Sequence, residues 1–179
     1  MDSGLSKEHQ QLVERVDELV RERFVPRAAR YDERYEAPWE DIQDLHKEGW
    51  LLSNLRKEYG GLGYGTDGDD PLPFFRLIER LARGNPSTAH CFQVHNNTVQ
   101  MISGMATPEQ RERWLEPTIE RGALLVGVGG EPPGAPPTTV YPVEGSFRVR
   151  GASTTRPTRR WPNGCGSRRG SRMRRAGSW

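Results

Sequence analysis

Apolar residues recur at helical spacing through residues 1–122 and predict five helices. The first helix begins at about Ser6, and Pro26 marks either a kink in that helix or its end. The second begins at Pro38 and ends near Gly49. Each of the other three follows a capping residue and a proline, and the three run from Asp70-Pro71 to Gly84, from Asn85-Pro86 to Gly104, and from Thr107-Pro108 to Gly122.

The fourth of these helices is expected to lie at the centre of a bundle. Its apolar residues face several directions rather than one, which is typical of a helix with neighbours on many sides. They are Ala89, Cys91, Phe92, Val94, Val99, Ile102 and Met105. The predicted fold class is therefore mainly α, with an N-terminal all-α helical bundle over residues 1–122.

The pattern changes at Ala123, where helical periodicity gives way to short β-like runs. Leu124 to Val128 form one such run, which ends in a Gly- and Pro-rich turn. Two more strands are predicted at Thr138 to Val143 and at Ser146 to Arg150. A hairpin with one extra strand is marginally stable alone. Residues 123–151 are therefore interpreted as the truncated start of a β-domain.

The composition changes again near Gly151. Residues 151–179 contain eight Arg, five Gly and four Ser, but no Lys, Asp, Glu, Leu, Ile, Val, Phe or Tyr. The net charge of +2 therefore sums a body at −6 and a tail at +8. Without aliphatic side chains, a segment cannot bury enough apolar area to offset the entropy of ordering it. We expect residues 152–179 to form a disordered, Arg-rich tail.

Two origins of this tail are considered. Arg-Gly-Ser segments with aromatic residues can bind RNA through phosphate contacts and stacking, which would make the protein a non-enzymatic helical module with a nucleic-acid-binding tail. The alternative is a shifted reading frame in a GC-rich gene. Codons for Ser153 to Thr158 exist that, with one added base, encode Lys-Tyr-Tyr-Ser-Thr-Asn. The frameshift is favoured, and a nucleic-acid partner is not expected, because an Arg-rich segment alone is weak evidence for one.

Residue spacing identifies no catalytic group. His90 and His95 are five residues apart, about 140° around a helix axis, so no metal site is predicted. The loop from Tyr59 to Gly65 lacks the preceding strand of a dinucleotide fingerprint, which favours a flexible interhelical turn. The acidic pair Glu40 and Asp44 is interpreted as solvated.

Polar residues inside the apolar fourth helix need partners. His95-Asn96-Asn97 either belongs to a satisfied core or faces a ligand, and both interpretations stay open. Cys91 and Cys165 provide no disulfide framework. No apolar run suggests a signal peptide or a membrane span, so a cytoplasmic location is expected.

The order of these pieces resembles the N-terminal half of the acyl-CoA dehydrogenase family over about residues 5–151. The resemblance rests on these segments: Gly49-Trp50-Leu51, Glu58-Tyr59-Gly60-Gly61-Leu62-Gly63, residues 76–83, Val94-His95-Asn96, residues 107–117, and Glu131-Pro132-Pro133-Gly134. It implies a helical domain, a middle β-domain and a C-terminal four-helix domain, with FAD between the last two and in part in a neighbouring subunit of a homo-oligomer.

The resemblance also implies an activity and site residues. In this family a C-terminal glutamate removes the α-proton of an acyl-CoA thioester, and the flavin accepts hydride from the β-carbon. Backbone contacts from Val128, Gly129 and Gly130 to FAD, and substrate contacts from His95 and Asn96, are implied. Without the C-terminal domain and its base, the chain is expected neither to retain FAD nor to turn over.

One departure from the family pattern leaves the activity open between two branches. Gly130-Glu131-Pro132 stands where the family has Thr-Glu-Pro, so a hydroxyl contact to the flavin is missing. Together with the helix that carries His95 and Asn96, this resembles the flavin-dependent monooxygenases of the same fold. In that branch the reduced flavin activates oxygen without an acyl-CoA.

Overall fold

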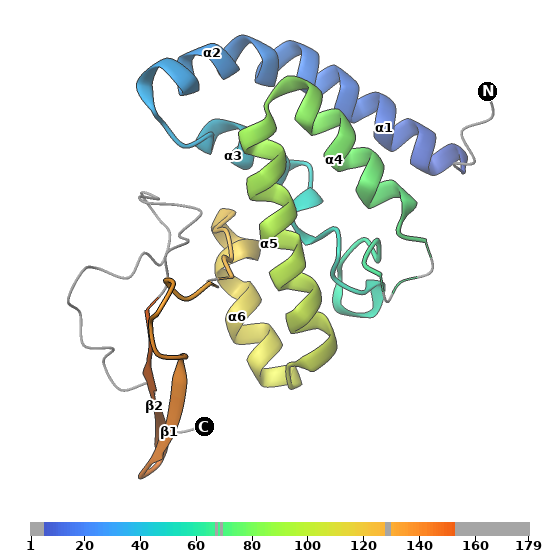
Figure 1. Ribbon diagram of the computed structural model, residues 1–179. Coiled ribbons are helices and arrows are strands. Elements are labelled where there is room, and N and C mark those ends of the chain that lie inside the picture. The colour runs from blue at the N-terminus through green and yellow to red at the C-terminus, as the bar shows by residue number, and fades with distance from the viewer. Residues whose placement is uncertain (1–5, 67, 69, 128–129, 153–179) are drawn as a thin grey trace. The chain divides into compact units, whose positions relative to one another are not determined.

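The computed structural model describes residues 6–66, 68, 70–127 and 130–152 (Figure 1). The chain falls into two compact units that divide between Gly127 and Val128. The first unit is helical, and the second contains a two-stranded hairpin. The fold is therefore mainly helical with a small sheet, as the sequence predicts. Residues 153–179, which make up almost all of the predicted Arg-rich tail, lie outside the described residues.

A continuous helical rod forms one side of the helical unit (Figure 1). It consists of α1 (Lys7–Leu19), the π-helical segment η1 (Val20–Phe24) and α2 (Val25–Arg34). The Ser6 hydroxyl caps α1 by accepting a hydrogen bond from the His9 N–H at 3.2 Å. The predicted start of the first helix is thus confirmed.

The rod continues through Pro26, so of the two alternatives predicted there, a kink or a helix end, the helix end is wrong. The Val25 N–H bonds to the Val20 carbonyl five residues back, which is the π-helical pattern. Pro26 has no N–H to give to the Glu22 carbonyl, and an α-helical turn would press its ring against that carbonyl. The wider π-helical turn just before Pro26 relieves this conflict.

The other predicted helices are present, and side chains cap the last two of them. They are α3 (Trp39–Lys47), α4 (Leu72–Gly84), α5 (Pro86–Met105) and α6 (Pro108–Arg121), with short 3-10 segments η2 (Trp50–Leu52) and η3 (Lys57–Tyr59) between α3 and α4. Thr107 and Gln110 form the expected capping box of α6. In the described part of the chain, no helix is long and apolar enough to cross a membrane.

The central position predicted for the fourth helix is confirmed. α5 contacts α3, α4, α6 and η2, and Figure 1 shows it between α4 and α6. Phe92 on α5 is fully buried, with its ring centroid 5.6 Å from that of Phe74 on α4. The core around it is built mainly from aliphatic side chains, including Leu45, Leu51, Leu77, Leu81 and Val99. Burial of these groups is the main force that holds the helices together.

The glycine-rich segment after η3 is the interhelical turn that the sequence favours. Its backbone folds against the residues after η2, with hydrogen bonds from Gly63 N–H to Leu55 O at 2.8 Å and from Tyr64 N–H to Ser53 O at 2.8 Å. A Cβ at Gly61 would lie 2.2 Å from the Leu55 carbonyl oxygen. Glycine is required there because two stretches of backbone meet.

The second unit contains β1 (Thr139–Val143) paired antiparallel with β2 (Ser146–Arg150). The turn at Glu144-Gly145 joins them, and Gly145 has a φ of 65°. Both predicted strands of this hairpin are confirmed. The strand predicted at Leu124 to Val128 is wrong over its described residues, 124–127, which have no strand partner. The Leu125 N–H instead bonds to the side chain of His95 on α5.

Gly84, the last residue of α4, tests how tightly α4 packs on the rod. A Cβ there would lie 2.5 Å from Cγ1 of Val20, a buried β-branched side chain with little rotamer freedom. We expect Gly84→Ala to lower the free energy of unfolding by about 1–3 kcal/mol in urea denaturation followed by circular dichroism.

Gly104→Ala on α5 is the matched control, because nothing lies within 4 Å of its Cβ position. This change should raise the free energy of unfolding by roughly 0.5–1 kcal/mol, since alanine favours helix. Equal effects of the two substitutions would contradict a tight contact between Gly84 and Val20.

Candidate functional site

The two residues with a predicted substrate role, His95 and Asn96, lie in the middle of α5. Asn85 caps the start of the helix: its side-chain oxygen accepts hydrogen bonds from the Ser87 N–H at 3.1 Å and the Thr88 N–H at 3.4 Å. From this start, α5 runs through the core and carries both side chains to fully buried positions. Buried polar side chains of this kind need hydrogen-bond partners.

His95 joins two backbone segments that are distant in sequence. Its Nδ1 accepts a hydrogen bond from the Leu125 N–H at 2.8 Å, and its Nε2 lies 3.0 Å from the Leu51 carbonyl oxygen. Because an amide N–H can only donate and a carbonyl can only accept, these contacts require the neutral tautomer with hydrogen on Nε2. Burial lowers the pKa of His95 to about 4, so the ring stays neutral at physiological pH.

Asn96 holds the backbone that follows η2. Its Oδ1 accepts a hydrogen bond from the Asn54 N–H at 3.0 Å, and its Nδ2 donates to the Phe92 carbonyl at 3.1 Å. The Asn54 side chain in turn donates to Oε1 of Gln100, one turn further along α5, at 3.4 Å. Gln100 also hydrogen-bonds the backbone and hydroxyl of Thr66. This row of amides fastens the loops between α3 and α4 to α5.

The structure thus places His95 and Asn96 among buried, hydrogen-bonded side chains. Of the two interpretations left open, this is the arrangement of a satisfied core. Both ring nitrogens of His95 are engaged, so a ligand would have to displace the Leu51 or Leu125 contact. The substrate-binding role of the two residues stays a prediction.

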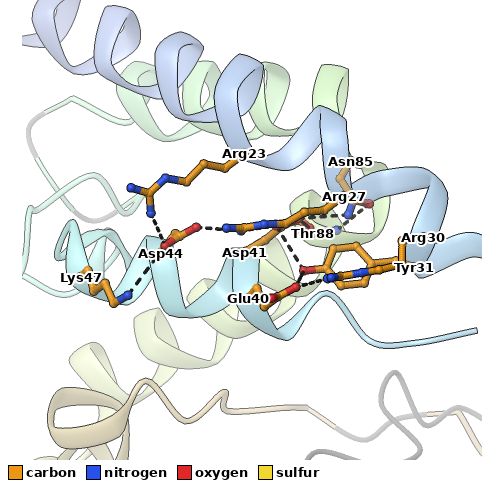
Figure 2. A network of polar contacts seen from close by, with 10 residues as sticks. All are labelled: Arg23, Arg27, Arg30, Tyr31, Glu40, Asp41, Asp44, Lys47, Asn85 and Thr88. Carbon is orange, nitrogen blue, oxygen red and sulfur yellow. Dashed lines mark hydrogen bonds and ion pairs between the residues drawn. The ribbon is translucent and has the colours of Figure 1, made fainter. Parts of the chain in front are cut away.

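A second polar cluster, the Asp41 network, joins α2, α3 and the start of α5 (Figure 2). Asp41 is fully buried and accepts hydrogen bonds from Thr88 Oγ1 at 2.8 Å, Asn85 Nδ2 at 3.2 Å and Arg27 Nη1 at 3.1 Å. Tyr31 also reaches it, at 3.4 Å. Burial raises the pKa of Asp41 above its usual value, and the hydrogen bonds from Thr88, Arg27 and Asn85 act against that rise.

Asp44 corrects the interpretation of Glu40 and Asp44 as a solvated pair. Its side chain is only 5% exposed and pairs with Arg23 at 2.7 Å and Arg27 at 2.8 Å. Glu40 is exposed and pairs with Arg30. Arg23 and Arg27 are four residues apart on the rod, and Asp41 and Asp44 are three apart on α3, so each pair shares a helix face. That spacing was a signal for the network, which sequence reasoning missed.

The segment expected to contact flavin follows α6. Val128 and Gly129 lie outside the described residues, and Gly130 has a φ of 78°, in the region that favours glycine. After it, Oε1 of Glu131 accepts a hydrogen bond from the Thr138 N–H at 3.1 Å. Hydrogen bonds from Thr138 hold the pKa of the Glu131 carboxyl below its usual value. Glu131 therefore closes the loop that leads into β1, and a flavin contact at residues 128–130 stays a prediction.

Comparison with known proteins identifies the helical unit. Residues 6–121 match the profile of the acyl-CoA dehydrogenase N-terminal domain, so the chain belongs to the acyl-CoA dehydrogenase family. A short-chain-specific acyl-CoA dehydrogenase from Clostridium acetobutylicum is 26% identical over 136 residues, which are 75% of this chain and 34% of that protein. The family is FAD-dependent. The resemblance seen in the sequence is confirmed.

Solved structures with the same fold include enzymes of more than one chemistry. Butyryl-CoA dehydrogenase from Megasphaera elsdenii aligns with 69% of this chain and 32% of its own, with a TM-score of 0.58 and 24% identity. Nitrososynthase from Micromonospora carbonacea var. africana aligns with 84% of this chain and 38% of its own, with a TM-score of 0.63 and 23% identity. The chain therefore spans about a third of the length of these relatives, and at such identities the likeness shows the fold alone.

The pKa of His95 predicts a pH-dependent contribution to stability. The pKa is about 4 in the folded protein and 6.5 for an unperturbed histidine, so between these values the unfolded chain takes up a proton that the native state does not. The contribution of neutral His95 to the free energy of unfolding is complete above pH 6.5, and it falls by about 3 kcal/mol as the pH drops to 4. The stability difference between wild type and His95→Gln should shrink over this range in urea denaturations at several pH values.

His90→Gln is the control for this experiment, because His90 is exposed on the same helix. The stability difference between wild type and this variant should not follow the His95 pattern. A His95→Gln difference that is constant from pH 7 to pH 4 would contradict a buried, neutral His95.

We expect substitution of Asp41 to have a large effect on stability, because its network joins three helices. Asp41→Ala would leave the buried Asn85 and Thr88 groups without their acceptor, and we expect the free energy of unfolding to fall by about 3 kcal/mol. Asp32→Ala, at an exposed position of α2, should change it by less than about 0.5 kcal/mol. Thermal or urea unfolding measures both, and similar effects would show that the network contributes little.

Proposed function

We propose that this chain forms the N-terminal helical domain and the start of the middle β-domain of an FAD-dependent oxidoreductase that dehydrogenates an acyl thioester. The observation that carries the proposal is the family match over residues 6–121. The similarity to a short-chain acyl-CoA dehydrogenase, over 75% of the chain, favours a short acyl-CoA as the substrate class. The domain boundaries near residues 122 and 151, the homo-oligomer and the cytoplasmic location belong to the same proposal.

Within this proposal, His95 is a positioning residue. It fixes the Leu125 backbone, and the chain runs from there through Gly127 to Gly130. A Cβ at Gly127 would meet only Thr98 Oγ1, at 3.8 Å, so the backbone there is open on that side. Gly130 also lacks a Cβ, which suits close approach of a flat ring to the peptide groups. FAD, when bound, supplies the hydride acceptor, and the backbone of Val128, Gly129 and Gly130 would contact it.

A flavin-dependent monooxygenase of the same fold is the second candidate. It is favoured by Gly130 in place of the family's threonine. Its fold is compatible with this chain, because nitrososynthase shares that fold. The two candidates differ in whether an acyl-CoA binds. Calorimetric titration of the chain with butyryl-CoA tests the first candidate: saturable binding would support the dehydrogenase over the monooxygenase.

The chain itself is expected to purify with far less than one FAD per polypeptide. It spans about a third of the length of its relatives, so most of a flavin site would have to come from elsewhere. The visible absorbance spectrum of the purified protein measures the flavin content, and a dye-reduction assay with butyryl-CoA measures turnover. One FAD per chain together with dye reduction would contradict this expectation.

Added FAD should nevertheless bind weakly if residues 128–130 form part of the site. Gly130→Val should weaken this binding about tenfold or more, because a branched side chain would cover the backbone and strain a φ of 78°. Quenching of flavin fluorescence in a titration measures the affinity. Gly134→Val is the matched control, since Gly134 has a φ of 77° in the same loop and no proposed flavin contact. Equal losses in both variants would place the flavin elsewhere.

A further inference from the structure

The β1–β2 hairpin has one apolar face, and that face is exposed. Cross-strand pairs lie side by side on the same face of a sheet, so Val140 and Val149 share a face with Pro142 and Phe147. Val140 and Val149 are each 55% exposed, and Phe147 is 63% exposed. The opposite face is mixed: it carries Arg148 and Arg150 together with Tyr141 and Val143, which are 45% and 40% exposed. An isolated two-stranded hairpin of this kind is marginally stable in water.

Pro142 reveals which backbone groups point outward. In an antiparallel pair, residues alternate between pairs that exchange two hydrogen bonds and pairs that exchange none. Pro142 has no N–H, so its pair with Phe147 cannot be a doubly bonded one. The N–H and C=O groups of Phe147 therefore point away from β1, and so do those of Val149 two residues on.

The two outer edges of the hairpin consequently differ. On β1, the outward-facing groups belong to Val140 and Pro142, and the proline removes a donor from that edge. On β2, Phe147 and Val149 present a complete set of donors and acceptors. The sheet consists of β1 and β2 alone among the described residues. The β2 edge is thus the one suited to accept another strand.

The charged side chains of β2 determine which strand can pair with this edge and in which register. An antiparallel strand must place an outward-facing residue of its own opposite Phe147 or Val149. For a second β2, three central registers satisfy this condition. The register with Phe147 opposite Val149 places Arg148 opposite Arg148. The register with Val149 opposite Val149 places Arg148 opposite Arg150. Only the register with Phe147 opposite Phe147 avoids this repulsion.

That register also brings opposite charges together. Arg150 of one copy comes opposite the turn that carries Glu144 of the other, and the two-fold axis creates this pair twice. Arg148 comes opposite Ser146. The segment that follows β2 in this same chain is rich in arginine, so it would instead bring like charges to Arg148 and Arg150.

We propose that β2 pairs antiparallel with β2 of a second copy of this chain, with Phe147 opposite Phe147, to form a four-stranded sheet. The pairing is isologous and closes at two copies, because each β2 edge is used once and each β1 edge is blunted by Pro142. The apolar faces of both hairpins become continuous across four strands, and a sheet of three or more strands with an apolar face can be stable by itself.

The first test measures the oligomeric state of the full chain by sedimentation equilibrium over a range of protein concentrations. A reversible monomer–dimer equilibrium is expected. Val149→Pro removes an outward-facing N–H from the β2 edge that meets the second copy, and should weaken the dimer about tenfold or more. Val140→Pro is the matched control: it changes the paired residue on the unused β1 edge and should leave the dissociation constant unchanged.

A charge exchange tests the register. Arg150→Glu should weaken the dimer, because it places a second carboxylate next to Glu144 of the other copy. The double variant E144R/R150E restores the opposite charges with the positions exchanged and should recover dimer formation. Rescue by the second change would not arise from non-specific association or from loss of hairpin structure.

Disulfide cross-linking locates the two-fold axis, in a background with Cys91→Ala and Cys165→Ala. The Cα atoms of a doubly bonded antiparallel pair are about 5.5 Å apart, within disulfide range, so Phe147→Cys should form a covalent dimer on oxidation. Val149→Cys should not, because the two copies of that residue lie about 13 Å apart along the strands.

Three results would overturn the proposal. The first is a wild-type chain that stays monomeric up to its solubility limit, as it would if a segment of the same chain or an acidic peptide covered the β2 edge. The second is a dimer whose affinity is unchanged by Val149→Pro. The third is a Val149→Cys variant that cross-links as readily as Phe147→Cys.

Discussion

The helical unit depends on the pairing of polar side chains along a buried helix. α5 carries Thr88, His95, Asn96 and Ser103 at buried positions, where each unpaired donor or acceptor would cost about 1–3 kcal/mol. Each of the four pairs with a different part of the chain: Asp41 on α3, Leu51 in η2, the Asn54 backbone after η2, and the Arg56 backbone before η3. Apolar burial supplies most of the stability, and these hydrogen bonds determine how the neighbours are placed against α5.

This arrangement connects the helical unit with the chemistry expected of the family. His95 holds the backbone at Leu125, a few residues before the stretch where the resemblance expects the flavin. The same fold occurs in butyryl-CoA dehydrogenase and in nitrososynthase, so the helical scaffold alone does not select one reaction. A precisely placed backbone serves either chemistry, because a flavin supplies the redox step and the protein supplies orientation.

Two kinds of interaction explain which features were predictable. Ser6, Asn85 and Thr107 cap helices through hydrogen bonds to groups two or three residues away, so the sequence around each helix start was sufficient. Asp44 looked solvated because its partners, Arg23 and Arg27, lie on another helix. Residues 124–127 have strand-like side chains, yet a buried histidine takes the Leu125 N–H, and a local pattern carries no information about that competitor.

The sequence by itself determined the five helical regions, the hairpin and the family, because caps, periodicity and ordered motifs are properties of neighbouring residues. Only the tertiary structure decided what the polar residues of the core do. His95 and Leu51 are 44 residues apart, and Thr88 and Asp41 are 47 apart. Contacts over such separations form only after the helices pack, since packing brings the groups together and removes the water that would otherwise satisfy them.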